Sequence, residues 1–206
     1  MALGGAAMLH PATVCAAGPR VAAIDWGLLE TALAIGAPPL AATELIQFRK
    51  IVVEPHVPEE VADLGLRGTP SFELLRIVAP ELILISGFYE YQRTALQRIA
   101  PVLSLPIFEA GIPPFSLARS SMLALGERLG RLDAAKSYAE ETLAELVRLR
   151  AAFQPQASRP VFVVSLGDSR HFRAFGADSM FGDVLGRLGL TNAWTDDTSY
   201  SAAAPV

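Results

Sequence analysis

Short apolar runs alternate along the chain with segments in which apolar residues recur every three or four positions. The runs at residues 82–85 (LILI) and 161–166 (VFVVSL) are almost continuously apolar, which is typical of parallel strands covered on both faces. Further β-like runs lie at 20–25, 40–43, 51–53 and 102–108. Helical spacing predicts helices over 28–35, 72–78, 94–99, 116–129 and 181–188. This alternation predicts an α/β fold with a mainly parallel sheet.

One long helix is predicted near the middle of the chain. Asp133 is placed to cap it, and from 134 to about 153 its apolar residues recur at three- and four-residue steps. The section that follows contains two strand candidates, few against the ~4–6 strands of a usual sheet. We therefore expect a truncated chain or an incomplete second lobe. The expected division is a signal-peptide remnant at 1–19, an N-terminal α/β lobe at 20–130, a connecting helix at 131–155 and a partial C-terminal α/β lobe at 156–206.

The first nineteen residues differ in composition from the rest. No charged side chain precedes Arg20, the apolar run at 2–9 is broken by Pro11, and a small residue follows Cys15, as at a signal-peptidase site. These features indicate the end of a secretory signal whose positively charged start would lie upstream. A disordered, alanine-rich tail fits nearly as well. No later segment reaches the ~18 apolar residues of a membrane-spanning helix.

Composition excludes several classes of function. The 206 residues include 17 Lys and Arg against 21 Asp and Glu, so the net charge of −4 disfavours nucleic-acid binding. A hydrophobic content of 51% is far too high for a disordered chain. The single Cys rules out a disulfide framework, and the histidines at 10, 56 and 171 are too scattered for a metal cluster. The sequence predicts no metal site.

One short motif suggests a hydrolase. Gly167, Asp168 and Ser169 directly follow the 161–166 run and resemble the nucleophile block of the GDS-type esterases. A nucleophilic serine needs a base within reach, yet the only later histidine is His171, inside the block itself. A plain turn after a strand explains the motif better. No Walker-type phosphate loop and no G-x-G-x-x-G dinucleotide motif is present.

Aromatic residues and arginines follow the predicted strands. They are Trp26, Arg67, Phe88, Tyr89, Tyr91, His171, Phe172, Arg173, Trp194 and Tyr200. Taken singly, each aromatic is more simply a packing residue and Arg67 a surface arginine. In open α/β sheets, however, ligands bind at the carboxyl ends of strands. Their recurrence after successive strands therefore predicts a binding site.

Four segments, in this order, resemble periplasmic iron(III)-hydroxamate (ferrichrome-type) siderophore-binding proteins of ABC importers. They are GLRGTPSFELL, PELILISGFYEYQRTALQRIAP, SRHFRAFGADSMFGDVLGRLGL and TNAW, and the similarity runs from about residue 20 to 194. The resemblance implies a two-lobed α/β solute-binding protein whose lobes are joined by a single long helix. It also implies a ligand in the cleft between the lobes.

The resemblance implies a set of ligand-binding residues. Arg67 and Tyr89 stand where the family contacts the hydroxamate oxygens, and Trp26 matches a tryptophan at the end of the first strand. Phe172 and Arg173 would face the cleft from the second lobe, and Tyr200, which is adjacent to a position where a cleft tryptophan is expected, would replace part of that surface. Ile51 and Ser201 depart from the family by replacing expected tryptophans. The siderophore already fills the coordination sphere of iron, so neither a cofactor nor a protein metal ligand is implied.

The resemblance predicts a function in transport. We expect a periplasmic, monomeric, non-enzymatic protein that binds an iron(III)-siderophore and delivers it to an ABC permease in the inner membrane. A related binding protein for haem or a cobalamin would use the same fold. An exported α/β hydrolase acting through Ser169 is the less favoured alternative.

Overall fold

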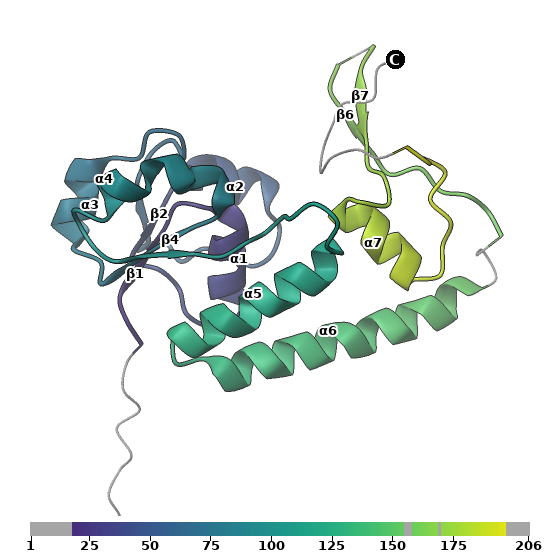
Figure 1. The fold of residues 1–206 in the computed structure, drawn as a ribbon, viewed down its shortest axis with the longest axis horizontal. Coiled ribbons are helices and arrows are strands. Elements are labelled where there is room, and N and C mark those ends of the chain that lie inside the picture. The colour runs from purple at the N-terminus through teal and green to yellow at the C-terminus, as the bar shows by residue number, and fades with distance from the viewer. Residues whose placement is uncertain (1–17, 155–157, 169, 197–206) are drawn as a thin grey trace, which may run out of the picture.

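The structure, a computed structural model, describes residues 18–154, 158–168 and 170–196 (Figure 1). The expected signal remnant lies almost wholly outside these residues. In chain order the elements are β1 (Val21–Ala23), α1 (Trp26–Ala34), β2 (Ala41–Ala42), α2 (Leu45–Ile51), β3 (Ala62–Asp63), α3 (Phe72–Val78), β4 (Leu82–Ile85), the 3-10 helix η1 (Gly87–Gln92), α4 (Arg93–Leu96), β5 (Val102–Ser104), α5 (Pro114–Arg128), α6 (Leu132–Phe153), β6 (Val164–Leu166), β7 (Phe172–Ala174) and α7 (Met180–Arg187).

The first five strands form one parallel sheet in the order β3-β2-β1-β4-β5. The chain therefore builds outward from β1 in one direction, then returns to the other side of β1 and builds outward again. In a sheet of this order the crossover helices lie on opposite faces on either side of the point where the direction reverses. That point lies between β1 and β4, and it determines where a ligand can enter.

Side chains of the central strands alternate between two cores, because successive residues of a strand point to opposite faces. On β4, Leu82 and Leu84 join the core that includes α1, α2 and the end of α5. Ile83 and Ile85 join the core beneath α3 and α4. The LILI run is fully buried, as its continuous apolar pattern predicts.

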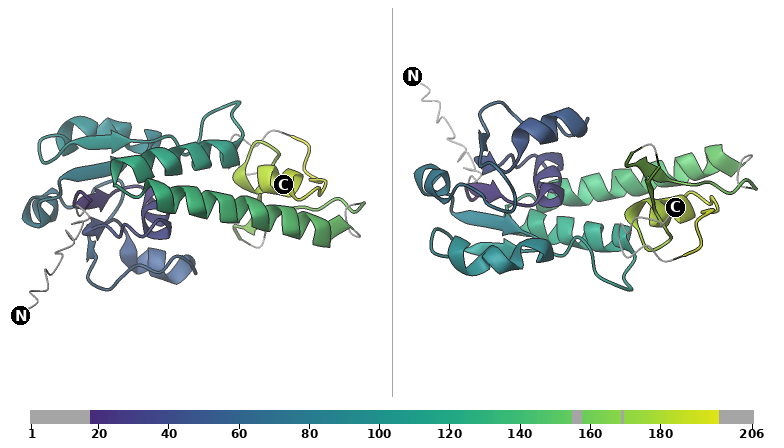
Figure 2. Two further views of the ribbon diagram at one scale, coloured as in Figure 1. Left: turned by 90° about the horizontal axis from the view of Figure 1, so that it is seen from below. Right: turned by 90° about the horizontal axis from the view of Figure 1, so that it is seen from above.

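α5 and α6 form an antiparallel pair that runs beneath the sheet and extends beyond it (Figures 1 and 2). The predicted long helix is confirmed, but Asp133 does not cap it. The N-cap is Arg131, whose side chain makes no capping bond, and Asp133 lies in the first turn. There its negative charge is favourable beside the free backbone N–H groups.

The second section was predicted wrongly in two respects. β6 and β7 form an antiparallel hairpin rather than part of a parallel sheet. All three residues of β6 are exposed, although the VFVVSL pattern predicted burial. Within the described part of the chain β6 pairs with β7 alone. Its apolar side chains are exposed, Leu166 to 82%.

One helix was missed in the first section. Residues 51–53 were predicted to be β-like because they are β-branched, whereas α2 extends from Leu45 to Ile51. The helix is amphipathic, with Leu45 and Phe48 buried in the core and Ile46 exposed. The remaining predicted strands and helices are present with shifted ends. Among the described residues no helix is both long and apolar enough to cross a membrane.

Gly126 lies where α5 and α6 approach each other closely. A Cβ atom at Gly126 would lie 2.6 Å from the Cβ of Ala135 and 3.1 Å from the backbone oxygen of Arg131. We expect Gly126→Ala to lower the free energy of unfolding by about 1–3 kcal/mol through overpacking. Chemical denaturation followed by circular dichroism measures this change.

Gly186→Ala is the matched control within α7. Nothing lies within 4 Å of a Cβ at Gly186, so alanine should raise the free energy of unfolding by about 0.5–1 kcal/mol through its higher helix propensity. Equal stabilities of the two variants would refute the close-packing role of Gly126.

Candidate functional site

Buried hydrogen bonds tie three strand ends together where the sheet reverses direction. The carboxylate of Asp25, directly after β1, accepts a hydrogen bond from the Ser86 hydroxyl after β4, at 2.8 Å. The Thr43 hydroxyl, after β2, donates to the backbone oxygen of Ile24 at 2.7 Å. The carboxyl ends of β1, β2 and β4 therefore form one rigid edge.

Trp26 is held on this edge as the first residue of α1. Asp25 is the N-cap of α1, and its side chain accepts from the Leu28 N–H at 3.1 Å. The Trp26 indole N–H donates to the backbone oxygen of Thr43 at 2.9 Å. The indole also packs edge-on against Phe48, with ring centroids 5.2 Å apart. The orientation of the ring is thus fixed from both sides.

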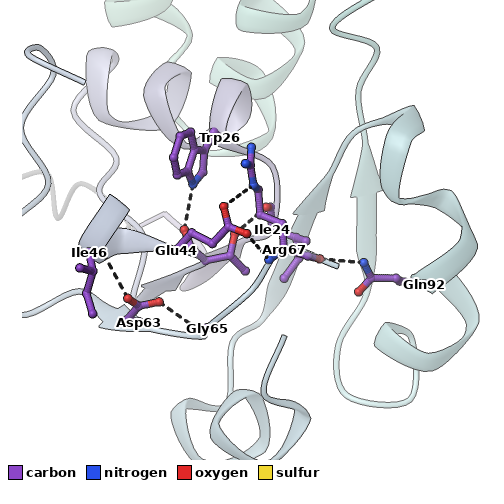
Figure 3. A network of polar contacts seen from close by, with 9 residues as sticks. Ile24, Trp26, Glu44, Ile46, Asp63, Gly65, Arg67 and Gln92 are labelled. Atoms are coloured by element: carbon purple, nitrogen blue, oxygen red, sulfur yellow. Dashed lines mark hydrogen bonds and ion pairs between the residues drawn. The ribbon is translucent and has the colours of Figure 1, made fainter. Parts of the chain in front are cut away.

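Arg67 lies over the Trp26 ring, with its guanidinium carbon 4.1 Å from the ring centroid (Figure 3). Arg67 lies on the loop between β3 and α3, and its side chain is 34% exposed. A guanidinium stacked on an indole is attracted by the negative face of the ring. The structure therefore brings together two of the residues that the sequence predicted for the site.

Glu44 is a third member of this cluster, and sequence reasoning missed it. Its carboxylate accepts from the Nε of Arg67 at 2.8 Å and from the backbone N–H of Arg67 at 3.1 Å (Figure 3). Glu44 follows β2 by two residues, so it obeys the same strand-end rule as the predicted residues. A carboxylate directly after the predicted strand at 40–43 is the signal that identifies it.

Gln92 holds the Arg67 loop from the opposite side and was also missed. Its Nε2 donates to the backbone oxygen of Arg67 at 2.9 Å and to the Tyr91 hydroxyl at 2.9 Å. Gln92 is only 6% exposed, and its Oε1 has no partner among the described residues. Arg67 is therefore held by side chains from two different elements.

Tyr89 lies close enough to this cluster to be influenced by its charges. It is part-buried on η1, directly beyond β4. Burial raises the pKa of the Tyr89 phenol, Arg67 lowers it, and Asp25 and Glu44 raise it by smaller effects. The phenol is therefore protonated at neutral pH and can donate a hydrogen bond.

Phe172 and Arg173, the predicted residues of the second section that the structure describes, do not join this cluster. Phe172 and Arg173 lie on β7, in the hairpin that Figure 1 shows apart from the five-stranded sheet. Among the described residues, no hydrogen bond or ion pair links them to Trp26, Arg67 or Tyr89. Tyr200 lies outside the described residues.

The turn between β6 and β7 contains a pair formed by Asp168 and His171. The Nδ1 of His171 lies 2.9 Å from both carboxylate oxygens of Asp168. Hydrogen bonds from the backbone of Arg170 and the side chain of His171 lower the pKa of Asp168. Ser169, the nucleophile of the hydrolase hypothesis, lies outside the described residues. The Asp–His pair is explained by closing an exposed turn.

Two cavities lie along α5, and none of Trp26, Arg67, Glu44 and Tyr89 lines either of them. One, of about 370 Å³, contains Glu30 and Glu54 among its lining residues, and burial followed by the charge of Asp25 raises the pKa of Glu30. The other, of about 540 Å³, is lined by Glu109, Asp178 and Asp183 among others. Both linings contain acidic side chains, in contrast to the donor-rich Trp26–Arg67 cluster.

The cluster itself can bind a ligand with oxygen acceptors and an apolar body. Within the described part of the chain, the two terminal nitrogens of Arg67 have no hydrogen-bond partner, so their donors remain available. Trp26 and Tyr89 offer ring surface beside them. Exposed apolar side chains adjoin the cluster, with Leu66 64% and Tyr91 70% exposed. The described residues contain no group of three or more His, Cys, Asp or Glu side chains arranged for a metal ion.

A doubly wound parallel sheet with a donor-rich, aromatic site at its reversal point defines a ligand-binding α/β protein. Comparison with known proteins then gives the family. The family model described as "Periplasmic binding protein" matches residues 21–206, and the chain belongs to this family.

The relatives are binding proteins for iron complexes. The iron(3+)-hydroxamate-binding protein FhuD of Escherichia coli K12 is 31% identical over 187 residues, which cover 91% of this chain and 63% of that protein. The chain therefore spans less than two thirds of the length of this relative. The ferric-anguibactin-binding protein FatB of Vibrio anguillarum is 22% identical over 71% of this chain and 46% of its own length.

Solved structures agree with this assignment. The Fe³⁺–Desferal-bound siderophore-binding protein FhuD from Vibrio cholerae superposes with a TM-score of 0.85 and 28% identity, over 91% of this chain and 71% of that chain. The catecholate-siderophore-binding protein VctP from the same species has a TM-score of 0.68 at 20% identity, over 91% and 67%, which shows the shared fold alone. The two-lobed α/β fold with a long connecting helix is thus confirmed.

The charges around Tyr89 can be tested by titration. Arg67→Ala should raise the pKa of Tyr89 further, because it removes a nearby cation, whereas Glu44→Gln should lower it. The pKa is measured by near-ultraviolet titration of each protein, from which the titration of the matching protein with Tyr89→Phe is subtracted to isolate this phenol. Shifts of the same sign in both variants would contradict the arrangement.

The same pKa shift predicts a pH dependence of stability. Because the folded-state pKa of Tyr89 lies above its ordinary value of 10.0, the unfolded chain loses this proton first. The stabilisation that the protonated Tyr89 contributes to the folded state is therefore fully present below the ordinary pKa of 10.0. It is lost as the pH rises from there through the folded-state pKa. Denaturation curves of the unsubstituted protein and Tyr89→Phe across this range measure the difference.

Proposed function

We propose that this chain binds an iron(III)-siderophore of the hydroxamate type at the carboxyl edge of its parallel sheet. The observation that carries the proposal is the Arg67 guanidinium, which is stacked at 4.1 Å on Trp26 with its terminal nitrogens available. Iron-bound hydroxamate oxygens carry partial negative charge and accept hydrogen bonds from guanidinium N–H groups. The similarity to hydroxamate-binding relatives supports the same ligand class.

The protein would contact the organic part of the siderophore, and the siderophore alone would coordinate the iron. Arg67 would donate to the hydroxamate oxygens, Tyr89 would add its phenolic O–H, and Trp26 would cover apolar ligand surface. The second lobe would close the site with Phe172 and Arg173, and Tyr200 would add ring surface. This assignment needs no cofactor and no protein ligand to iron.

The family suggests the remaining parts of the proposal. The protein would act in the periplasm as a monomer and without enzymatic activity, and it would deliver its ligand to an ABC permease of the inner membrane. Its parts would be lobes at 20–130 and 156–206, the connecting helix at 131–155 and a signal remnant at 1–19.

Arg67→Ala tests the proposed binding mode. Titration with ferrichrome or ferrioxamine should quench the Trp26 fluorescence of the unsubstituted protein with saturation. The substitution should raise the dissociation constant about 10- to 100-fold, because hydrogen bonds from a charged donor contribute ~1.5–3 kcal/mol. Arg98→Ala is the matched control, since Arg98 is exposed in the same sheet unit.

Two different results would contradict two different parts of the proposal. Saturable binding that is equal in both variants would remove Arg67 from the site. Absence of saturable binding by the unsubstituted protein, to either complex, would refute the proposed function.

A further inference from the structure

The positive charge of Arg67 is already balanced within its own site, which bears on the ligand that the site can select. Glu44 accepts from the Nε and the backbone N–H of Arg67, while the terminal nitrogens remain available. The ion pair is partly shielded, with side chains 34% and 19% exposed. A ligand would therefore meet the donors of a guanidinium whose net charge is largely cancelled.

The backbone of Glu44 indicates that this carboxylate has a specific role. Glu44 has φ 52° and ψ 39°, a left-handed conformation that costs a residue with a side chain about 1–2 kcal/mol. Its N–H donates to the backbone oxygen of Gly65 at 2.7 Å, which aligns it with the Arg67 loop. Glycine would adopt this conformation without strain but would leave Arg67 unpaired.

Two further carboxylates lie in the sheet unit near the site. Asp25, which directly precedes Trp26, is buried, and its oxygens accept hydrogen bonds from the Leu28 N–H and the Ser86 hydroxyl. Asp63 lies at the base of the Arg67 loop, where it accepts from the backbone N–H groups of Gly65 and Ile46 (Figure 3). On the sheet side of the site, one guanidinium is therefore accompanied by three carboxylates, which disfavours polyanions there.

Resting on the proposed function, we propose that Glu44 is a specificity-determining residue. By neutralising Arg67 while leaving its terminal donors free, it favours neutral iron(III) complexes over anionic ones. Three hydroxamate monoanions neutralise iron(III), whereas three catecholate dianions leave a trianion. Both complexes present oxygen acceptors to Arg67, so the local charge balance separates them.

A measurement of local charge tests the premise without any siderophore. In a Trp194→Phe background, Trp26 is the remaining tryptophan, and its quenching by iodide is compared with its quenching by neutral acrylamide. Glu44→Gln should raise the iodide-to-acrylamide ratio of quenching constants by about twofold, because it removes a negative charge within the Debye length. Glu140→Gln makes the same change on the exposed face of α6 and should leave the ratio unchanged. An unchanged ratio in Glu44→Gln overturns the inference.

Ligand titrations then test specificity. Dissociation constants for ferrichrome and for the trianionic iron(III) complex of enterobactin are measured on the same proteins. Glu44→Gln should shift their ratio toward the trianion by on the order of tenfold, and Glu140→Gln should not. An unchanged ratio with intact ferrichrome binding refutes this inference alone. Failure of the unsubstituted protein to bind either complex refutes the proposed function and this inference with it.

A measurement on the unsubstituted protein covers the case in which Glu44→Gln does not fold. If the charge of Arg67 is balanced, added salt should leave the affinity for the trianion unchanged or increase it. A steep loss of that affinity with increasing salt would mean that the guanidinium acts as an unbalanced cation, and it would refute the inference.

Discussion

The buried carboxylate of Asp25 is the contact on which the edge of the sheet depends. It is 4% exposed, and each of its oxygens accepts a hydrogen bond, one from the start of α1 and one from Ser86 beyond β4. A buried carboxylate is costly unless its oxygens are paired in this way. Because β1 and β4 are the strands between which the sheet reverses direction, one residue fixes both the position of Trp26 and the path into η1, which carries Tyr89.

Arg67 shows how a loop can be held in place without regular structure. β3, which precedes it, has two residues, so the sheet alone cannot position the loop. Instead Glu44 and Gln92 hold it from two sides, and Trp26 lies beneath the guanidinium. A side chain that is already ordered loses little entropy when a ligand binds, so the available donors of Arg67 are preorganised.

The second section is attached to the sheet unit through α5 and α7. The side chain of Asp183 accepts from the Phe115 N–H at 2.9 Å and pairs with Arg187, whose guanidinium lies 4.4 Å from the Phe115 ring centroid. Beyond this contact the β6–β7 hairpin extends away from the five-stranded sheet (Figure 1). Its apolar side chains Val164 and Leu166 are exposed. The two parts of the chain thus differ in how fully their apolar surface is covered.

The sequence by itself determined the elements whose signals are local. The LILI run predicted a strand buried on both faces, and Ser71 predicted the start of α3, where its hydroxyl accepts from the Leu74 N–H. The strand-end rule also identified Trp26, and the glycine-rich loop pattern GLRGTP identified Arg67. These features depend on residues that lie within a few positions of each other along the chain.

Only the tertiary structure decided which side chains meet. Glu44 and Gln92 contact Arg67 from 23 and 25 residues away, and no local pattern in the sequence records such a pairing. The same limit explains β6, whose apolar pattern describes a strand suited to burial but does not say what covers it. Burial and ion pairing are properties of the neighbours that the fold assembles, and those neighbours are distant in sequence.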